Sequence, residues 1–249
     1  MQPSLLEKEK FKKLFYENGW VKIQSFFTKS EIKKINEELN LFVKNIAPKL
    51  KPGEIHYSEK KINTIHVLDK YSKFFKKLLH SNKVKSLAEN ILEDIVVPQW
   101  AQFFAKPAKE GMAAPPHQDN YYWCIDDANA LTVWIALNDS SEQNGGVYYY
   151  KKSHKIGFLE HKPSYAPGSS QTIKYPDGID VFDTDLPNLN AGDCLIHHCL
   201  VVHGSKPNKS NHPRIGCTLR YISKNSKIDK FMQYKYNESL DKHFKKLKR

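Results

Sequence analysis

The chain has 249 residues, of which 40% are hydrophobic and 12% aromatic, enough to bury the core of one large domain. It contains no run of about 18 apolar residues, so no membrane span is expected. The net charge of +12 would attract anions, but the dense basic end from Lys245 to Arg249 lacks interleaved aromatic residues, so we predict no nucleic-acid binding.

The cysteines indicate the compartment. Cys124, Cys194, Cys199 and Cys217 form no Cys-x-x-Cys pair, so we interpret them as reduced, buried thiols rather than as a disulfide framework. The first eight residues contain no apolar stretch of the signal-peptide type. We therefore expect a cytoplasmic protein.

Residues 1–93 are predicted to be mainly helical. Apolar residues spaced for one helix face indicate a helix over 5–18, and Gly19 is a typical C-terminal stop. Residues 20–24 alternate like a short strand. Thr28 and Glu31 have the spacing of a capping box that opens a second helix, and residues 67–92 predict one or two more.

Residues 94–225 have a different character, with short β-branched and aromatic segments separated by turn residues. The expected strands are Ile95–Lys106, Tyr121–Cys124, Ala130–Leu137, Gly146–Tyr150, Asp193–His198 and Arg214–Ser223. The polar stretch from His161 to Leu189 is expected to be a long loop and a lid over the site. Residues 226–249 contain a final surface helix. We predict one domain over 1–249, a mainly β double-stranded β-helix (a cupin-like jelly roll) braced by N-terminal helices.

Two histidines and an aspartate suggest a metal site. His117 and Asp119 are two positions apart, and His203 follows much later in the chain. On a regular strand, residues i and i+2 point to the same face, so His117 and Asp119 would point the same way and Tyr121 and Trp123 would continue that side. Two imidazoles and one carboxylate can occupy one face of an octahedral Fe(II) and leave the other open. A His-x-Asp pair is also found as an ordinary surface hydrogen-bonding pair.

Arg214 adds to the metal interpretation. It lies 11 positions after His203, at the start of an apolar strand, from which its side chain can reach the cavity. A guanidinium binds a carboxylate in a fixed two-point geometry, as a dicarboxylate cosubstrate would require. The alternative for Arg214 is a salt bridge at the rim of the fold.

A Cys/His-rich stretch raises the alternative of structural zinc. It contains Cys194, His197, His198, Cys199 and His203. Structural zinc usually takes ligand pairs from two separate turns, and no second Cys pair is near. On a continuous strand from Gly192, His197, Cys199 and His203 would share one face, and we expect those other than His203 to be core residues or neighbours of the ligands.

At these residues the chain resembles the phytanoyl-CoA dioxygenase family of Fe(II)- and 2-oxoglutarate-dependent oxygenases. The likeness extends beyond the three ligands and covers nearly the whole chain. The similar segments are Phe15 to Gly19 with the helix from Ser30, Phe103 to Pro107, Pro116 to Trp123, Leu131 to Asp139, Asn144 to Gly157, Gly192 to His198, and His203 to Arg214. Lys152 stands where the family usually has Gly.

The resemblance implies roles for these positions. His117, Asp119 and His203 would bind Fe(II), and Arg214, assisted by Ser205, would bind the distal carboxylate of 2-oxoglutarate. The pocket for cosubstrate or substrate would be lined by Gln102, Lys106 and Trp134, and the substrate walls would be Tyr121, Tyr122 and Trp123. The implied reaction uses O2 to hydroxylate an unactivated C–H bond of a small-molecule or thioester-linked metabolite and releases succinate and CO2. Halogenating relatives have Ala or Gly in place of Asp119, so the aspartate favours hydroxylation.

Other functions stay open. The same centre can support desaturation, epimerisation or ring closure, and a jelly roll can also be a non-catalytic binding protein. The positive net charge favours an anionic small-molecule substrate, whereas the Tyr/Trp cluster would suit a quaternary amine by cation–π contact. The sequence selects neither substrate and does not define the oligomeric state.

Overall fold

The structure is a computed structural model, and it describes residues 3–166, 168–174 and 182–247. The helices are α1 (Leu5–Asn18), α2 (Lys29–Asn45), α3 (Leu68–Tyr71), α4 (Lys73–Leu79), α5 (Asn82–Leu92), α6 (Asn120–Trp123) and α7 (Lys230–Leu247). The strands are β1 (Trp20–Ile23), β2 (Ile55–Ser58), β3 (Lys61–Ile65), β4 (Val96–Lys106), β5 (Ala114–His117), β6 (Ala130–Ala136), β7 (Val147–Tyr150), β8 (His161–Ala166), β9 (Ser169–Ile173), β10 (Thr184–Asp185), β11 (Cys194–His198), β12 (His203–Ser205) and β13 (Arg214–Ser223).

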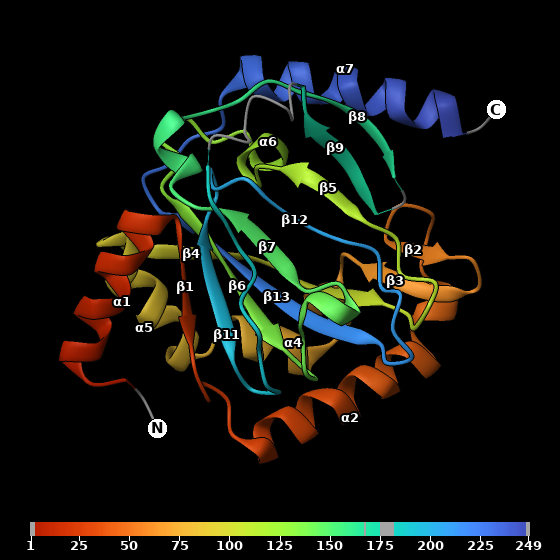
Figure 1. Cartoon of the computed structure of the whole chain (residues 1–249), viewed down its shortest axis with the longest axis horizontal. Helices are drawn as coiled ribbons and strands as arrows, with labels where there is room; N and C mark the ends of the chain where they lie inside the picture. Colours follow the sequence, from red (N-terminus) through yellow and green to blue (C-terminus); the bar gives the residue numbers. More distant parts are fainter. Residues whose placement is uncertain (1–2, 167, 175–181, 248–249) are drawn as a thin grey trace.

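Two antiparallel sheets form the centre of the fold. Among the described residues, the larger sheet has the order β1-β11-β6-β13-β4-β3-β2 and the smaller one β10-β7-β12-β5, while β8 and β9 form a separate hairpin. Strands far apart in sequence are neighbours in both sheets (Figure 1). This confirms the predicted double-stranded β-helix with flanking helices.

The larger sheet separates the hydrophobic core from the site. Along β13, Cys217, Leu219 and Tyr221 belong to the buried core cluster that also contains residues of α2, α4 and α5. The alternate residues Arg214, Thr218 and Arg220 line a cavity on the other face of the sheet. The two-residue period of a strand therefore divides one segment between core packing and a polar site.

The N-terminal helices begin where the sequence indicates. The Thr28 side chain accepts a hydrogen bond from the Glu31 backbone at 3.2 Å, and the Glu31 carboxylate accepts one from the Thr28 backbone at 2.7 Å. This capping box opens α2, which buries Ile32, Ile35, Leu39 and Phe42. In Figure 1, α2 runs along the lower edge of the molecule, α1 and α5 lie together at the left, and α7 crosses the top. None of the helices in the described ranges is long and apolar enough to cross a membrane.

Residues 121–124 do not form the predicted strand, and that prediction was wrong. Residues 121–123 belong to the one-turn helix α6, and Cys124 caps its C-terminal end with a left-handed φ of 54°. The Asn120 amide closes this turn, because its Nδ2 donates to the Ile125 carbonyl at 3.0 Å and its Oδ1 accepts from the Ile125 backbone at 3.2 Å. The strand preference of the aromatic residues is outweighed by this local hydrogen bonding.

The prediction of a long loop over residues 161–189 was also wrong in part. This segment contains the hairpin of β8 and β9 and the short strand β10, while residues 167 and 175–181 lie outside the described part of the chain. The hairpin contacts β5 and α7, so it forms part of the cover of the site. The β2–β3 hairpin and β5 were not predicted; in β5, Pro115 and Pro116 mask the strand pattern, and prolines are tolerated there because β5 is an edge strand.

Candidate active site

Two adjacent strands bring the histidines together. His117 at the end of β5 is the register partner of His203 at the start of β12. Their ring centroids are 4.3 Å apart. Asp119 lies two residues beyond β5, with helical backbone angles at the start of α6. The carboxylate is therefore brought to the histidines by a turn, and not by the strand alternation that the sequence predicted.

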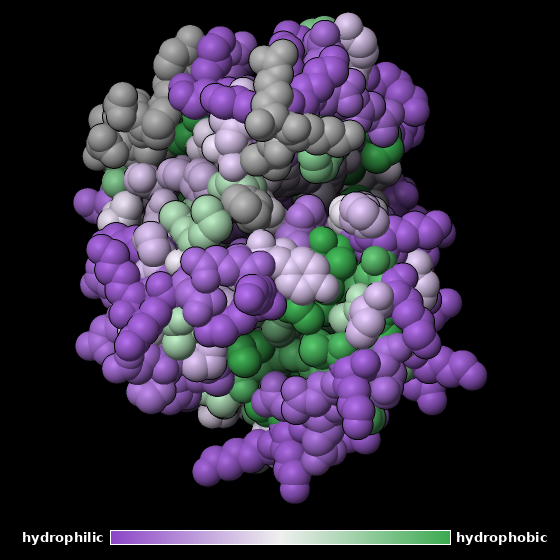
Figure 2. Space-filling view, turned by 90° about the vertical axis from the view of Figure 1, so that its right-hand side faces the viewer, coloured by the Kyte–Doolittle hydropathy of each residue, from purple (hydrophilic) through white to green (hydrophobic). Residues whose placement is uncertain are grey.

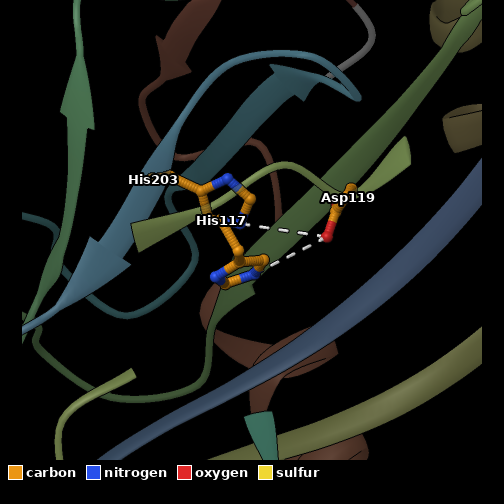
Figure 3. Close-up of side chains that lie close together, drawn as sticks. All are labelled: His117, Asp119 and His203. Carbon is orange, nitrogen blue, oxygen red and sulfur yellow. Dashed lines mark ion pairs between the residues drawn. The ribbon is translucent and has the colours of Figure 1, made fainter. Parts of the chain in front are cut away.

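The three side chains converge on one point. The Nε2 atoms of His117 and His203 each lie 3.9 Å from the Asp119 Oδ1 atom (Figure 3). One donor atom from each residue lies within 4.8 Å of the others, a spacing that suits a single metal ion.

Hydrogen bonds set the imidazoles for metal binding. The Nδ1 atom of His117 contacts the Pro115 carbonyl at 2.8 Å, and that of His203 contacts the Val201 carbonyl at 3.0 Å. A carbonyl only accepts, so each Nδ1 carries the hydrogen and each Nε2 keeps its lone pair toward the shared point. Burial lowers the pKa of both histidines to about 4, so they are neutral ligands at neutral pH.

Asp119 presents one free oxygen. Its Oδ2 accepts hydrogen bonds from the Thr132 hydroxyl at 2.7 Å and from His197 Nε2 at 3.2 Å. Burial alone would raise the pKa of Asp119, but the Arg220 guanidinium and the His197 hydrogen bond outweigh it and hold the pKa well below its ordinary value. The carboxylate is therefore charged and directs Oδ1 at the histidines.

His197 is itself oriented by Tyr149. The Tyr149 hydroxyl lies 2.9 Å from His197 Nδ1, and both residues are buried. Because a carboxylate only accepts, His197 donates from Nε2 to Asp119, and its Nδ1 atom pairs with the Tyr149 hydroxyl. His197 and His203 lie in different sheets, so the prediction that they share one face of a continuous strand was wrong.

A cavity of ≈590 Å³ opens beside the triad. It is lined by most of the residues expected there: Gln102, Lys106, Tyr122, Trp123, Trp134, Ser205 and Arg214. Tyr121 does not line it; its ring stacks on His161 with centroids 4.2 Å apart, because α6 turns it away from the cavity. Figure 2 shows the side of the molecule where β2 and β3 lie, with hydrophobic side chains gathered below a hollow in an otherwise hydrophilic surface.

Arg214 is buried in this cavity, and contacts with Gly145 and Trp134 hold its guanidinium group in place. Its Nε and Nη2 atoms both donate to the Gly145 carbonyl at 3.1 Å. The guanidinium carbon lies 5.4 Å from the Trp134 ring centroid. Burial lowers the pKa of Arg214 only to about 10, so the side chain stays charged.

Gly216 makes room for that aromatic support. It lies two residues after Arg214 on the same face of β13, and a Cβ atom built there would be 2.2 Å from Trp134 Cζ2. The absence of a side chain at Gly216 lets the indole lie across the strand next to Arg214.

Several residues of the site were missed in the sequence. Tyr149 and Thr132 are identified only by their contacts with His197 and Asp119, which the sequence does not reveal. His197 was expected as a core residue or a neighbour of the ligands, and it lies beside Asp119. Arg220 could have been found, because it lies six positions after Arg214 on the same strand, and an even spacing places it on the same face.

The comparisons with known proteins agree with this geometry. The family model described as phytanoyl-CoA dioxygenase matches residues 15–216. The chain belongs to the phytanoyl-CoA dioxygenase family. The matched range contains the triad and Arg214 but ends before Arg220. Within this family, His117, Asp119 and His203 are the facial triad for iron, with 2-oxoglutarate as cosubstrate.

Two curated relatives illustrate the range of the family. A mouse phytanoyl-CoA dioxygenase domain-containing protein 1 is 30% identical over 170 residues, which are 66% of this chain and 58% of the relative. The chain thus spans 58% of that relative's length. A probable alpha-ketoglutarate-dependent hypophosphite dioxygenase of Stutzerimonas stutzeri is 24% identical over 219 residues, covering 84% of this chain and 76% of that one.

Solved structures share the fold of this phytanoyl-CoA dioxygenase family member. The epimerase SnoN in complex with Fe3+, alpha ketoglutarate and nogalamycin RO has a TM-score of 0.75 at 18% identity, covering 92% of this chain and 90% of that one. EctD from S. alaskensis with 2-oxoglutarate and 5-hydroxyectoine has a TM-score of 0.75 at 17% identity, covering 91% of this chain and 78% of that one.

Proposed function

We propose that this protein is an Fe(II)- and 2-oxoglutarate-dependent hydroxylase. It would oxidise an unactivated C–H bond of a small-molecule or thioester-linked metabolite and release succinate and CO2. The observation that carries the proposal is the convergence of two neutral imidazole Nε2 atoms and one carboxylate oxygen in a cavity that also holds a buried guanidinium. Iron(II) bound there with 2-oxoglutarate and O2 would supply the oxidising chemistry.

Arg214 is the proposed ligand of the distal carboxylate of 2-oxoglutarate. Its Nε and one hydrogen of Nη2 are used by Gly145, so the rest of the guanidinium fork stays available for a carboxylate. The buried Ser205 hydroxyl and the Lys106 amine line the same cavity and supply further donors. Gln102 and Trp134 complete this proposed pocket.

The chain itself orients and shields the reactants. Trp134 supports the Arg214 guanidinium, while Tyr122 and Trp123 form part of the wall on the substrate side. Residues of α7 and the β8–β9 hairpin also line the cavity and limit the access of water. Asp119 supports oxygen transfer rather than halogen transfer, because its carboxylate occupies the metal position that a halide would need.

The test is a screen for succinate release. The purified protein with Fe(II), 2-oxoglutarate and O2 is assayed against acyl thioesters, amino-acid-like metabolites and phosphonates. A hydroxylase product would carry one oxygen atom from ¹⁸O2, whereas an epimerised, desaturated or cyclised product would carry none. Succinate release that occurs without label in the product would reject hydroxylation, and the absence of iron-dependent release with every class would reject the oxygenase function.

A further inference from the structure

We propose that Arg220 binds a negatively charged head group of the substrate beside the metal site, so that the substrate is a small organic anion with an apolar part. The inference rests on the proposed function, because it assigns the substrate class of the same cavity. Arg220 lies beyond the residues that the family model matches.

The position of Arg220 places its charge next to the reacting centre. Its side chain is 13% exposed, and its Nη2 atom lies 3.9 Å from Asp119 Oδ1. The guanidinium carbon lies 5.1 Å from the Trp123 ring centroid, and both residues line the cavity. An anion bound here would bring its neighbouring carbon atoms close to the metal site.

The donors of Arg220 are not used by the protein. Its Nε atom is buried without a hydrogen-bond partner, and in the described part of the chain its guanidinium makes no hydrogen bond. The contact with Asp119 is too long for one. The Thr218 hydroxyl, on the same face of β13, is also buried and unpartnered. Buried donors without partners are costly, so this group of donors fits a ligand with acceptor oxygens.

Asp119 is not available to neutralise the positive charge of Arg220. Its Oδ2 atom already accepts from Thr132 and His197, and its Oδ1 atom is the proposed metal ligand. It is the only acidic residue lining the cavity among the residues that the structure describes. Iron(II), Asp119, Arg214 and doubly charged 2-oxoglutarate together sum to zero charge, and a protonated Lys106 would only add positive charge, so the charge of Arg220 is left for a further anion.

The distal carboxylate of 2-oxoglutarate does not reach both arginines. Arg214 and Arg220 are six residues apart on one strand, so their Cα atoms lie about 20 Å apart. Arg214 is held against Trp134 and Gly145, whereas Arg220 lies over Trp123. The cavity therefore has two separate cationic points, and we assign one to the distal carboxylate of the cosubstrate and the other to the substrate anion.

The rest of the lining suits an apolar body. The apolar lining includes Val67, Phe104, Met112, Leu240 and Phe244. Met112 and Phe244 are 43% and 41% exposed, so they mark the side of the cavity that meets solvent. A substrate held by its anionic end at Arg220 would extend its apolar part along these residues.

Binding to an inactive metal form tests the proposal. Protein loaded with Mn(II) and 2-oxoglutarate under nitrogen is titrated by calorimetry with hexanoate, hexyl phosphate, hexanamide and hexylamine. We expect at least one of the two anions to bind at least about tenfold more tightly than the amide and the amine. R220Q should lose that preference and R220K should keep part of it. K224Q, which removes the same charge from an exposed neighbour outside the cavity, should bind like the unmodified protein.

Two results would overturn the proposal: no preference of the unmodified protein for either anion, or the same preference in R220Q. If R220Q does not fold, T218V replaces it, and an unchanged anion affinity in T218V then counts against the anion site. Because the readout is binding without turnover, it is separate from the succinate assay. Anion binding that depends on Arg220 in a protein without succinate release would reject the hydroxylase and keep the anion site.

Discussion

Arg214 and Lys106 lie directly opposite each other on β13 and β4, and both side chains are buried in the cavity. Two like charges at such a pair are unfavourable unless an anion lies between them. Burial, with a further contribution from Arg214, lowers the pKa of Lys106 from 10.5 to about 6. The Lys106 amine is therefore neutral at pH 8 while the pocket is empty, and it donates to the Met112 carbonyl.

Binding of 2-oxoglutarate should consequently take up protons. The carboxylate would raise the pKa of Lys106, so between pH 7 and 9 the amine gains a proton on binding. Calorimetric titrations at pH 8 in two buffers with different ionisation heats measure this uptake. K106M should abolish the uptake, and equal heats for the unmodified protein in both buffers would contradict the assigned position of the cosubstrate.

Arg214 should control the affinity for 2-oxoglutarate. R214Q removes a buried charged hydrogen-bonding group, so we expect a loss of about 2–3 kcal/mol, a factor of about 30 to 150 in the 2-oxoglutarate requirement. R214K keeps the charge but not the planar fork, so its 2-oxoglutarate requirement should lie between those of the unmodified protein and R214Q. A 2-oxoglutarate requirement that R214Q leaves unchanged removes Arg214 from the cosubstrate site.

Gly216 should matter through Trp134. In G216A the new methyl group would meet the indole, and we expect a loss of about 1–3 kcal/mol in unfolding free energy together with weaker 2-oxoglutarate binding. Denaturant unfolding and 2-oxoglutarate titration measure the two effects. W134F in the G216A background should recover part of the stability, because a smaller ring relieves the contact; purely additive losses would show that the two residues do not interact.

Tyr149 should act as a positioning residue for the metal ligand Asp119. Y149F removes the hydrogen bond that fixes His197, so the imidazole can turn and weaken its hydrogen bond to the carboxylate. Loss of a direct hydrogen-bond partner of a metal ligand typically costs about 10- to 100-fold in metal affinity, so we expect Y149F, which acts through His197, to cost up to that amount. Anaerobic Fe(II) titration compares Y149F with Y148F, which changes the neighbouring tyrosine of β7. Equal affinities in the two variants would leave Tyr149 with a packing role only.

The sequence predicts the site better than it predicts the segments that carry it. Residue type and spacing indicate His117, Asp119, His203 and Arg214, since iron and a dicarboxylate each need particular donor groups, and the resemblance to the family implies their roles. The turn that carries Asp119 does not follow, because α6 depends on Asn120 hydrogen bonds that override the strand preference of its aromatic residues. The contacts of His197 and Arg220 also require the pairing of β11, β6 and β13, which no local pattern specifies.

Anaerobic Fe(II) binding in the presence of 2-oxoglutarate tests the central claim most directly. We predict that the unmodified protein binds one Fe(II) per chain and develops the visible charge-transfer absorption of an iron–2-oxoglutarate complex. H203A, in which one of the two converging Nε2 atoms is removed, should bind Fe(II) at least about tenfold more weakly and lose that absorption. Equal Fe(II) affinity and equal absorption in H203A and the unmodified protein would contradict the assignment of His117, Asp119 and His203 as the iron site.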